Sequence, residues 1–209
     1  MKKGIILFVA LIMVFALSAF SAVQNLTILH VNDTHGRAWA VKDGDNMVGG
    51  FAAISTLVDQ IRAEVEAKGG NVLVVHAGDF NTGVPESDLL DAVPDIAAMN
   101  MIGFDVVTLG NHEFDKDRDV LNMQLGMLEA AVVNANIYNA EGNPFFTPYV
   151  IKDVNGLKVA FVGFLTEKTT VLEPIYLQGM DFRNVAEVAK DFVPKLRQDI
   201  CNNLKFLGI

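Results

Sequence analysis

Residues that commonly bind metal ions follow three separate apolar segments of this sequence. Asp33 and His35 follow the first segment, Asp79 follows the second, and Asn111 with His112 follows the third. A carboxylate, an imidazole and an amide oxygen together suit a divalent ion such as zinc or manganese. The residue types therefore favour a metal site assembled from distant parts of the chain.

The elements that must position these residues alternate between patterns typical of strands and of helices. Near-continuous apolar runs predict buried strands, and apolar residues at helical spacing predict the helices between them. We expect strands at 26–31, 71–75, 104–109 and 132–138, and helices at 50–67, 94–102, 118–131 and 185–196. Asn155 and Gly156, between two further apolar segments, predict a hairpin turn. The alternation predicts an α/β fold built on a largely parallel sheet.

A parallel sheet would bring the three polar motifs to one place. Ligands of open α/β sheets bind beyond the carboxyl ends of the strands, and each spacing between motifs leaves room for one helical crossover. Gly78 precedes Asp79 and Gly110 precedes Asn111, so the backbone can turn tightly and approach a ligand closely at both positions. We therefore expect one shared metal site at this edge of the sheet.

Each motif has a purely structural interpretation when it is taken alone. An Asp at the end of a strand, such as Asp33, is more often a turn former or a helix cap than a ligand. His30 and His76 lie within apolar strands, and we interpret both as core histidines. The combination of three motifs at these distances is what favours the metal site.

The composition excludes several classes of protein. The formal charge of −9 argues against nucleic-acid binding, because affinity for phosphate backbones comes mainly from Lys and Arg. Cys201 is the single cysteine, which excludes an internal disulfide and a cysteine-based zinc site. An apolar content of 51% argues for a folded chain rather than a disordered one. An acidic chain that bound an anionic substrate would need local positive charge at its site.

The first 21 residues have the pattern of a secretory signal peptide. Lys2 and Lys3 precede an uncharged apolar run at 4–20, and Ala19 and Ser21 supply the small residues of a cleavage site. We expect residues 1–21 to direct export to the periplasm or the cell exterior, and 22–209 to form the folded part. Retention as an N-terminal anchor is the alternative, and we expect no other contact with a membrane.

The three motifs in this order resemble the calcineurin-like metallophosphoesterase superfamily. The run from Asn81 to Ala92, with the Gly-Asn-His-Glu-Phe-Asp motif at 110–115, resembles more specifically the bacterial periplasmic 5′-nucleotidase/UDP-sugar hydrolase family. The resemblance covers about residues 26–200 and implies the αββα sandwich of the metallophosphoesterases. It also implies hydrolysis of a nucleotide or nucleotide sugar.

The resemblance implies a site with two divalent ions, of zinc, manganese or cobalt, bridged by a carboxylate and a hydroxide. Carried over to this sequence, Asp33 and His35 would hold the first ion, Asp79 would bridge both, and Asn111 would hold the second. In this family the ions activate the attacking hydroxide and clamp the phosphoryl oxygens.

Two further residues take catalytic roles by the same resemblance. His112 would stabilise charge on the transferring phosphoryl group or protonate the leaving oxygen. Asp115 would orient that imidazole and favour its protonated form.

The family pattern also contains residues that this sequence lacks. Its three remaining metal ligands are histidines that lie downstream, and no histidine follows His112. The sequence therefore supplies four of the seven expected protein ligands, and the C-terminal nucleotide-binding domain of the family is absent from it. We expect a sandwich that is incomplete at its C-terminal side.

Two interpretations of the shortened chain remain open from the sequence. Asn202 and Asn203 stand where the family has an apolar strand, which a shifted reading frame would explain. A genuinely short gene and a deliberately trimmed chain are the alternatives. The chain is then the N-terminal part of a phosphoester hydrolase, or alternatively a catalytically inactive exported fragment that binds metal or phosphate. The sequence leaves the substrate, the metal and the oligomeric state open.

Overall fold

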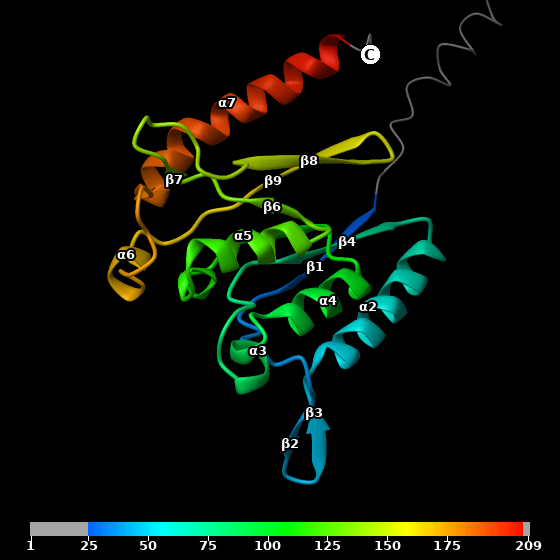
Figure 1. Cartoon of the computed structure of the whole chain (residues 1–209). Coiled ribbons are helices and arrows are strands. Elements are labelled where there is room, and N and C mark those ends of the chain that lie inside the picture. The colour runs from blue at the N-terminus through cyan, green and yellow to red at the C-terminus, as the bar shows by residue number, and fades with distance from the viewer. Residues whose placement is uncertain (1–24, 207–209) are drawn as a thin grey trace, which may run out of the picture.

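The computed structural model describes residues 25–206, with side chains from 25 to 200 (Figure 1). The expected signal peptide at 1–21 lies outside this described part of the chain. Within residues 25–206, no helix combines the length and the apolar character needed to cross a membrane.

A four-stranded parallel sheet forms the centre of the fold. Its strands are β1 (Leu26–Val31), β4 (Asn71–His76), β5 (Val106–Thr108) and β6 (Ala131–Val133), in the order β1-β4-β5-β6. All three pairings are parallel, so the carboxyl ends of the strands lie at one edge. The predicted α/β fold with a central parallel sheet is confirmed.

Helices between the strands bury one face of this sheet. They are α2 (Phe51–Glu66), α4 (Val93–Ile102) and α5 (Arg118–Met127). The larger core cluster joins Phe51 and Val58 of α2 and Ile96 and Met99 of α4 to Val74 of the sheet. This packing explains why the apolar residues of these helices recur at helical spacing.

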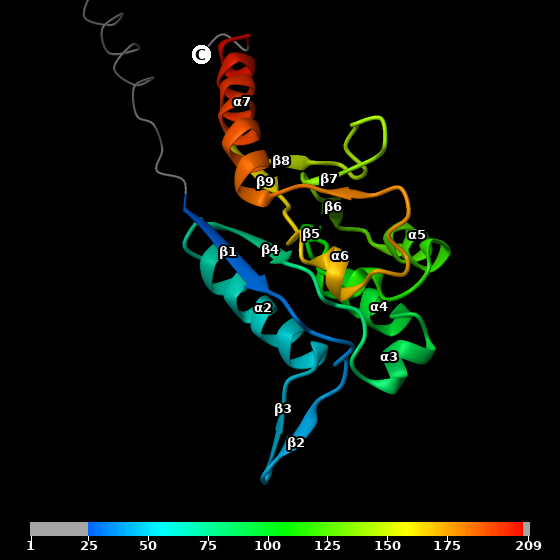
Figure 2. The same cartoon turned by 90° about the vertical axis from the view of Figure 1, so that its left-hand side faces the viewer.

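An antiparallel hairpin and a long helix lie on the other side of the sheet from α2 and α4 (Figures 1 and 2). The hairpin is formed by β8 (Tyr149–Val154) and β9 (Leu157–Val162), and its turn contains Asn155 and Gly156 with positive φ angles of 53° and 87°. The predicted hairpin is therefore confirmed. Helix α7 (Val185–Phe206) lies beyond it.

Several predicted elements have different bounds in the structure. The helix expected at 118–131 ends at Met127, and the strand expected at 104–109 is limited to Val106–Thr108. The strand expected at 132–138 is divided into β6 and β7 (Ile137–Tyr138), and β7 pairs instead with β10 (Asp181–Phe182). The division follows from Asn136, whose buried side chain donates to the carbonyl oxygens of Leu165 and Arg183. The helix expected to end at 196 continues to Phe206.

Several short elements had no strong sequence pattern. A small hairpin of β2 (Val41–Asp43) and β3 (Asn46–Val48) projects from the body and is exposed along its whole length (Figure 1). The others are α3 (Pro85–Leu89), the 3₁₀ turn η1 (His112–Phe114) and α6 (Thr169–Leu172).

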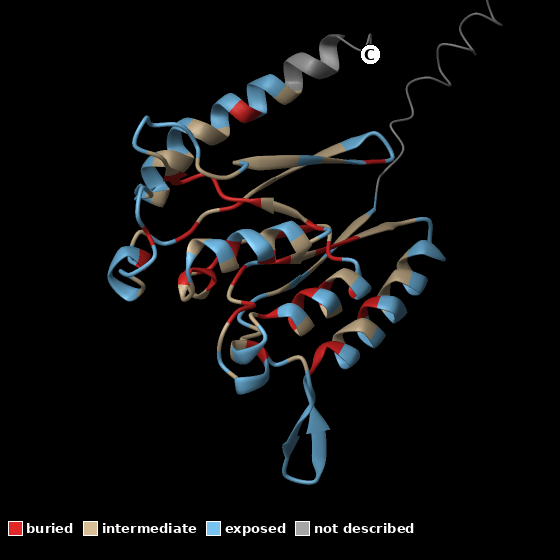
Figure 3. Cartoon of the chain, in the orientation of Figure 1, coloured by how far each residue is buried: buried red, intermediate tan, exposed pale blue. Residues whose placement is uncertain are grey.

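The two histidines assigned to the core have different environments. His76 is buried at the end of β4, as predicted, where it accepts a hydrogen bond from the Gly78 amide at 3.1 Å. His30 is exposed, so its assignment to the core was wrong. The reason is that β1 is an edge strand with one open face, on which Ile28 is also 48% exposed (Figure 3).

Candidate metal centre

The segments that follow β1 and β4 are joined by backbone hydrogen bonds. The Asp33 amide donates to the Gly78 carbonyl oxygen and the His35 amide to that of Asp79, both at 3.0 Å. Asp33, His35 and Asp79 have positive φ angles of 53°, 47° and 57°. Such conformations cost non-glycine residues about 1–3 kcal/mol each and cluster at functional sites. The fold thus holds the backbone of these three residues in strained conformations.

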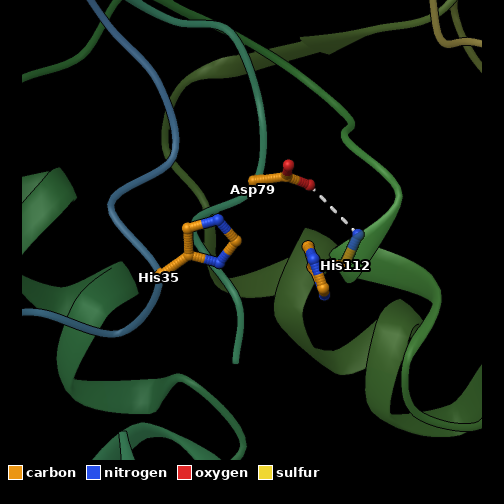
Figure 4. A group of neighbouring side chains, drawn as sticks. All are labelled: His35, Asp79 and His112. Carbon is orange, nitrogen blue, oxygen red and sulfur yellow. Dashed lines mark hydrogen bonds between the residues drawn. The ribbon is translucent and has the colours of Figure 1, made fainter. Parts of the chain in front are cut away.

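Three of the predicted site residues form a group that could hold a metal ion (Figure 4). His35, Asp79 and His112 each offer one ligand atom, and these atoms lie within 4.8 Å of one another. The His112 backbone amide also donates to Asp79 Oδ1 at 3.0 Å, which joins the segment after β5 to the one after β4. The structure therefore brings all three sequence motifs together.

The His35 ring is oriented by a second hydrogen bond. Its Nδ1 donates to the Thr82 carbonyl oxygen at 3.1 Å, which leaves Nε2 as the ring nitrogen that could bind a metal ion. His35 Nε2 lies 3.5 Å from Asp33 Oδ1, so the two residues that follow β1 present donors side by side. An amide hydrogen bond from Asn32, with a smaller contribution from His35, holds the pKa of Asp33 below its usual range.

His112 and Asp115 form a hydrogen-bonded pair beside this group. His112 Nδ1 donates to Asp115 Oδ2 at 2.9 Å, and the Thr82 hydroxyl donates to the same oxygen. Partial burial by itself lowers the pKa of His112. The hydrogen bond and the negative charge of Asp115, aided by Asp79, outweigh burial and raise it. The arrangement favours a protonated imidazole with its Nε2 directed away from Asp115.

Glu113 is a site residue to which sequence reasoning gave no role. Its side chain is fully buried and accepts four backbone N–H groups, those of Asp79, Phe80, Asn81 and Gly110, at 2.6–3.1 Å. Burial raises the pKa of Glu113 to about 7. The backbone N–H donors act in the opposite direction, because they favour the ionised form. One carboxyl group thus fixes the segments after β4 and β5 to each other. Its place in the Gly-Asn-His-Glu motif was the available signal.

Glycine is required where these two segments touch. A Cβ atom on Gly110 would lie 2.0 Å from Asp79 Oδ1, and one on Gly78 would lie 2.4 Å from the Gly110 nitrogen. Both distances are shorter than any real contact of a Cβ atom. The sequence predicted a close approach to a ligand. What the structure shows at these glycines is a close approach between protein segments, of Gly110 to the Asp79 side chain and of Gly78 to the Gly110 backbone.

Glu173 is a second residue that the sequence did not indicate. It caps the C-terminus of α6, and its carboxyl group lies with His112 and Asp115 in a group whose ligand atoms are within 4.8 Å of one another. Burial and the Asp115 carboxylate raise the pKa of Glu173, while His112 and a hydrogen bond with the Asn111 side chain lower it. Asn111, half-buried at the start of η1, is therefore also in this neighbourhood.

The donors present fit a divalent ion of the kind that the sequence predicted. Imidazole nitrogen and carboxylate oxygen come together from three strand ends, and His35 and Asp79 are held by hydrogen bonds of their own, as in established metal sites.

The chain is similar to known phosphoesterases over most of its length. The model of the calcineurin-like phosphoesterase family matches residues 26–193. A 5′-nucleotidase of Vibrio cholerae is 48% identical over 175 residues, which cover 83% of this chain and 31% of that protein. Protein UshA of Escherichia coli is 40% identical over 207 residues, covering 95% of this chain and 37% of that protein.

A solved structure agrees with these similarities. The NAD nucleotidase of Haemophilus influenzae superposes with a TM-score of 0.73 at 30% identity, over 83% of this chain and 32% of that one. The chain spans about a third of the length of the relatives it matches. With the family matched across the sheet, the helices and all three strand-end motifs, the chain belongs to the calcineurin-like phosphoesterase family.

Proposed function

We propose that this chain carries part of the catalytic site of an exported, metal-dependent phosphoester hydrolase of the 5′-nucleotidase type. The observation that carries the proposal is the group of His35, Asp79 and His112, with the His112–Asp115 pair beside it. The names of the relatives support a nucleotide as substrate, and a UDP-sugar is the second substrate we would test.

In this proposal each donor has a separate task. Asp33, His35 and Asp79 would hold a first divalent ion, and Asp79 with the amide oxygen of Asn111 would hold a second. When bound, such ions polarise phosphoryl oxygens and lower the pKa of a water molecule. They also supply the positive charge that an acidic chain needs in order to bind a phosphate.

His112 acts on the substrate rather than on the ions. Asp115 holds the proton on Nδ1, so Nε2 can carry a second proton and donate it to a phosphoryl or leaving-group oxygen. The raised pKa of His112 favours this protonated form. Glu113 keeps Asp79 and His112 in register by fixing the two segments from which they project.

A second candidate function is binding of metal or phosphate without turnover. It is favoured by the donors that the described residues offer, since the proposal assigns Asp33, His35 and Asp79 to the first ion and only Asp79 and Asn111 to the second. The two candidates share the metal site and differ in catalysis.

One experiment separates them. The purified chain is assayed for bound metal and for hydrolysis of a chromogenic phosphodiester and of AMP, with added manganese or cobalt. The hydrolase is supported if the chain hydrolyses either substrate and Asp79→Asn abolishes that hydrolysis. The control is Asp43→Asn on the exposed β2–β3 hairpin, which should leave hydrolysis intact. Bound metal without hydrolysis supports the second candidate. Absence of metal binding at millimolar manganese overturns both.

A further inference from the structure

His76 is a buried imidazole that lies beside two segments carrying predicted metal ligands. It is the last residue of β4 and is 1% exposed, and its ring packs edge-on against Phe80 and Phe104. Polar atoms in such apolar surroundings are costly to bury unless they form hydrogen bonds. None of the roles assigned to the strand-end residues uses this imidazole.

Both ring nitrogens of His76 form hydrogen bonds, and the two bonds have opposite directions. The Gly78 backbone amide donates to Nδ1 at 3.1 Å, so Nδ1 carries no proton. The proton of the neutral ring is then on Nε2, which lies 3.1 Å from the Thr34 hydroxyl oxygen and donates to it. A single tautomer of the ring thus satisfies both contacts.

These two contacts join the segment after β1 to the segment after β4. On the first segment, Thr34 stands between Asp33 and His35, and on the second, Gly78 directly precedes Asp79. The two neighbours of Thr34 have positive φ angles, and non-glycine residues keep such conformations only where the surrounding structure holds them. The imidazole holds the residue between these two, from a position 42 residues away in sequence.

Packing alone would not require a histidine at this position. An apolar side chain of similar size would fill the same space without burying two nitrogen atoms, but the Thr34 hydroxyl and the Gly78 amide would lose these partners. The hydroxyl therefore separates packing from positioning, because changing Thr34 removes the link and leaves the ring of His76 in its place.

We propose that His76 is a positioning residue of the metal site. Through its two hydrogen bonds, it sets the pair Asp33 and His35 against Asp79, so that the three can face one ion. This inference rests on the proposed function, which assigns those three residues to the first ion. It predicts that loss of the link weakens binding of that ion and leaves the sheet intact.

The first test reads the ring in the metal-free wild type. In ¹⁵N-labelled protein, long-range proton–nitrogen correlation distinguishes a protonated ring nitrogen from an unprotonated one. We expect the His76 signals, assigned by their loss in His76→Gln, to show the proton on Nε2 at neutral pH. A proton on Nδ1, or rapid exchange of the proton between the two nitrogens, would overturn the inference.

The second test breaks the link at its other end. Thr34→Val keeps the shape of the side chain and removes the hydroxyl, whereas Thr34→Ser keeps the hydroxyl. We expect the backbone amides of Asp33 and His35 to exchange with solvent about 10-fold faster in Thr34→Val, and near the wild-type rate in Thr34→Ser. Thr34→Ala is the second variant if the valine variant does not fold.

The matched control is Thr108→Val. It removes a hydroxyl hydrogen bond of 2.9 Å to the Val133 carbonyl oxygen, between β5 and β6 and away from β1. The exchange rates of Asp33 and His35 should be unchanged in this variant. Unchanged rates in Thr34→Val would overturn the inference.

The third test measures the ion. Free Mn²⁺ is followed by electron paramagnetic resonance during titration, and the first ion is identified as the binding event that Asp33→Asn weakens. We expect Thr34→Val to weaken it about 10-fold or more, with recovery in Thr34→Ser and no change in Thr108→Val. Unchanged affinity in Thr34→Val would overturn the inference. A wild type that binds no Mn²⁺ would contradict the proposed function, and the first two tests would still decide whether His76 holds the segment.

Discussion

Two histidines of this chain show how neighbours set the chemistry of one residue type. The pKa of His112 is raised, because the hydrogen bond and charge of Asp115 outweigh partial burial. The pKa of His76 is lowered to about 4, chiefly because the ring is buried in the end of the sheet. The first residue is suited to donating a proton near neutral pH, and the second to staying neutral. Sequence position relative to the strand separates them: His112 follows a strand, and His76 ends one.

The buried His76 gives the fold a predictable sensitivity to acid. The pKa of His76 is about 4 in the folded chain and has the ordinary value of 6.5 in the unfolded chain. Between these pH values the unfolded chain binds a proton at His76 and the folded chain does not. The associated stability is fully present above pH 6.5 and is lost as the pH falls toward 4. Between pH 7 and pH 5 we expect this residue alone to reduce the free energy of unfolding by about 2 kcal/mol.

Urea unfolding of the metal-free chain at the two pH values measures this effect. In His76→Gln, the free energy of unfolding should fall by about 2 kcal/mol less between pH 7 and pH 5 than it does in the wild type. His30→Gln is the comparison variant, since it leaves His76 buried and removes only the smaller effect of the neighbouring His30 charge on the pKa of His76, so most of the pH dependence should remain. The same pH dependence in wild type and His76→Gln would contradict the assignment.

At the level of elements, the site depends on the two segments that follow β4 and β5. Within the described residues, no hydrogen bond of the sheet joins these two segments to each other. β4 and β5 pair only over Val75–Val106 and His76–Val107, and the chain then leaves the sheet in both. Glu113 replaces the missing ladder bonds by accepting four N–H groups from the two segments. A carboxylate is suited to this task because it offers several acceptor positions and no donor.

Glu113→Gln should therefore be far more damaging than its small change of shape suggests. The new NH₂ group would face backbone N–H donors, and at least one buried donor would lose its acceptor, at a cost of about 2–3 kcal/mol in the free energy of unfolding. Glu141→Gln, at an exposed position, should stay within about 0.5 kcal/mol of the wild type. Denaturant unfolding of both variants is the measurement, and equal stabilities would show that Glu113 does not fix the segments.

Glycine substitutions test the close approach of the same segments. Gly110→Ala would place a Cβ atom 2.0 Å from Asp79 Oδ1, so the carboxylate must move, and we expect weaker Mn²⁺ binding and a loss of about 1–3 kcal/mol. Gly126→Ala in α5 meets no atom within 4 Å and should instead stabilise the chain by about 0.5–1 kcal/mol. In thermal unfolding, we expect Gly110→Ala to lower the unfolding temperature and Gly126→Ala to raise it. An unchanged unfolding temperature in Gly110→Ala would contradict the geometry.

The elements that could be predicted from sequence are those whose patterns are local. The bounds of β1 were predicted to the residue. Those of α2 and α4 differ from the predicted ranges by one residue at one or both ends. The agreement is close because apolar periodicity and flanking glycines define where these elements begin and end. The break between β6 and β7 was missed because it depends on Asn136, whose partners Leu165 and Arg183 are distant in sequence. Glu173 was missed for the same reason, since nothing in its own segment indicates the residues it would meet.

For the molecule as a whole, the negative charge opposes the binding of a phosphate. The chain has a formal charge of −9, and Asp33, Asp79, Asp115 and Glu173 add carboxyl groups at the candidate site itself. Of the cations near the site in sequence, Lys116 pairs with Asp91 at 2.7 Å, whereas Arg37 is exposed two residues after His35. The four carboxyl groups at the site outnumber it. Without divalent ions, this surface should repel an anion.

Binding of inorganic phosphate should therefore depend strictly on a divalent ion. In equilibrium dialysis at low ionic strength, we expect the chain to retain labelled phosphate in the presence of Mn²⁺ and to retain none in EDTA, because the acidic field is then uncompensated. Asp79→Asn should lose retention in Mn²⁺, whereas Asp43→Asn, which removes the same charge from the exposed hairpin, should keep it. Equal retention in EDTA and Mn²⁺ would mean that a protein cation binds the phosphate. Loss in both variants would mean that net charge, rather than a metal site, controls the interaction.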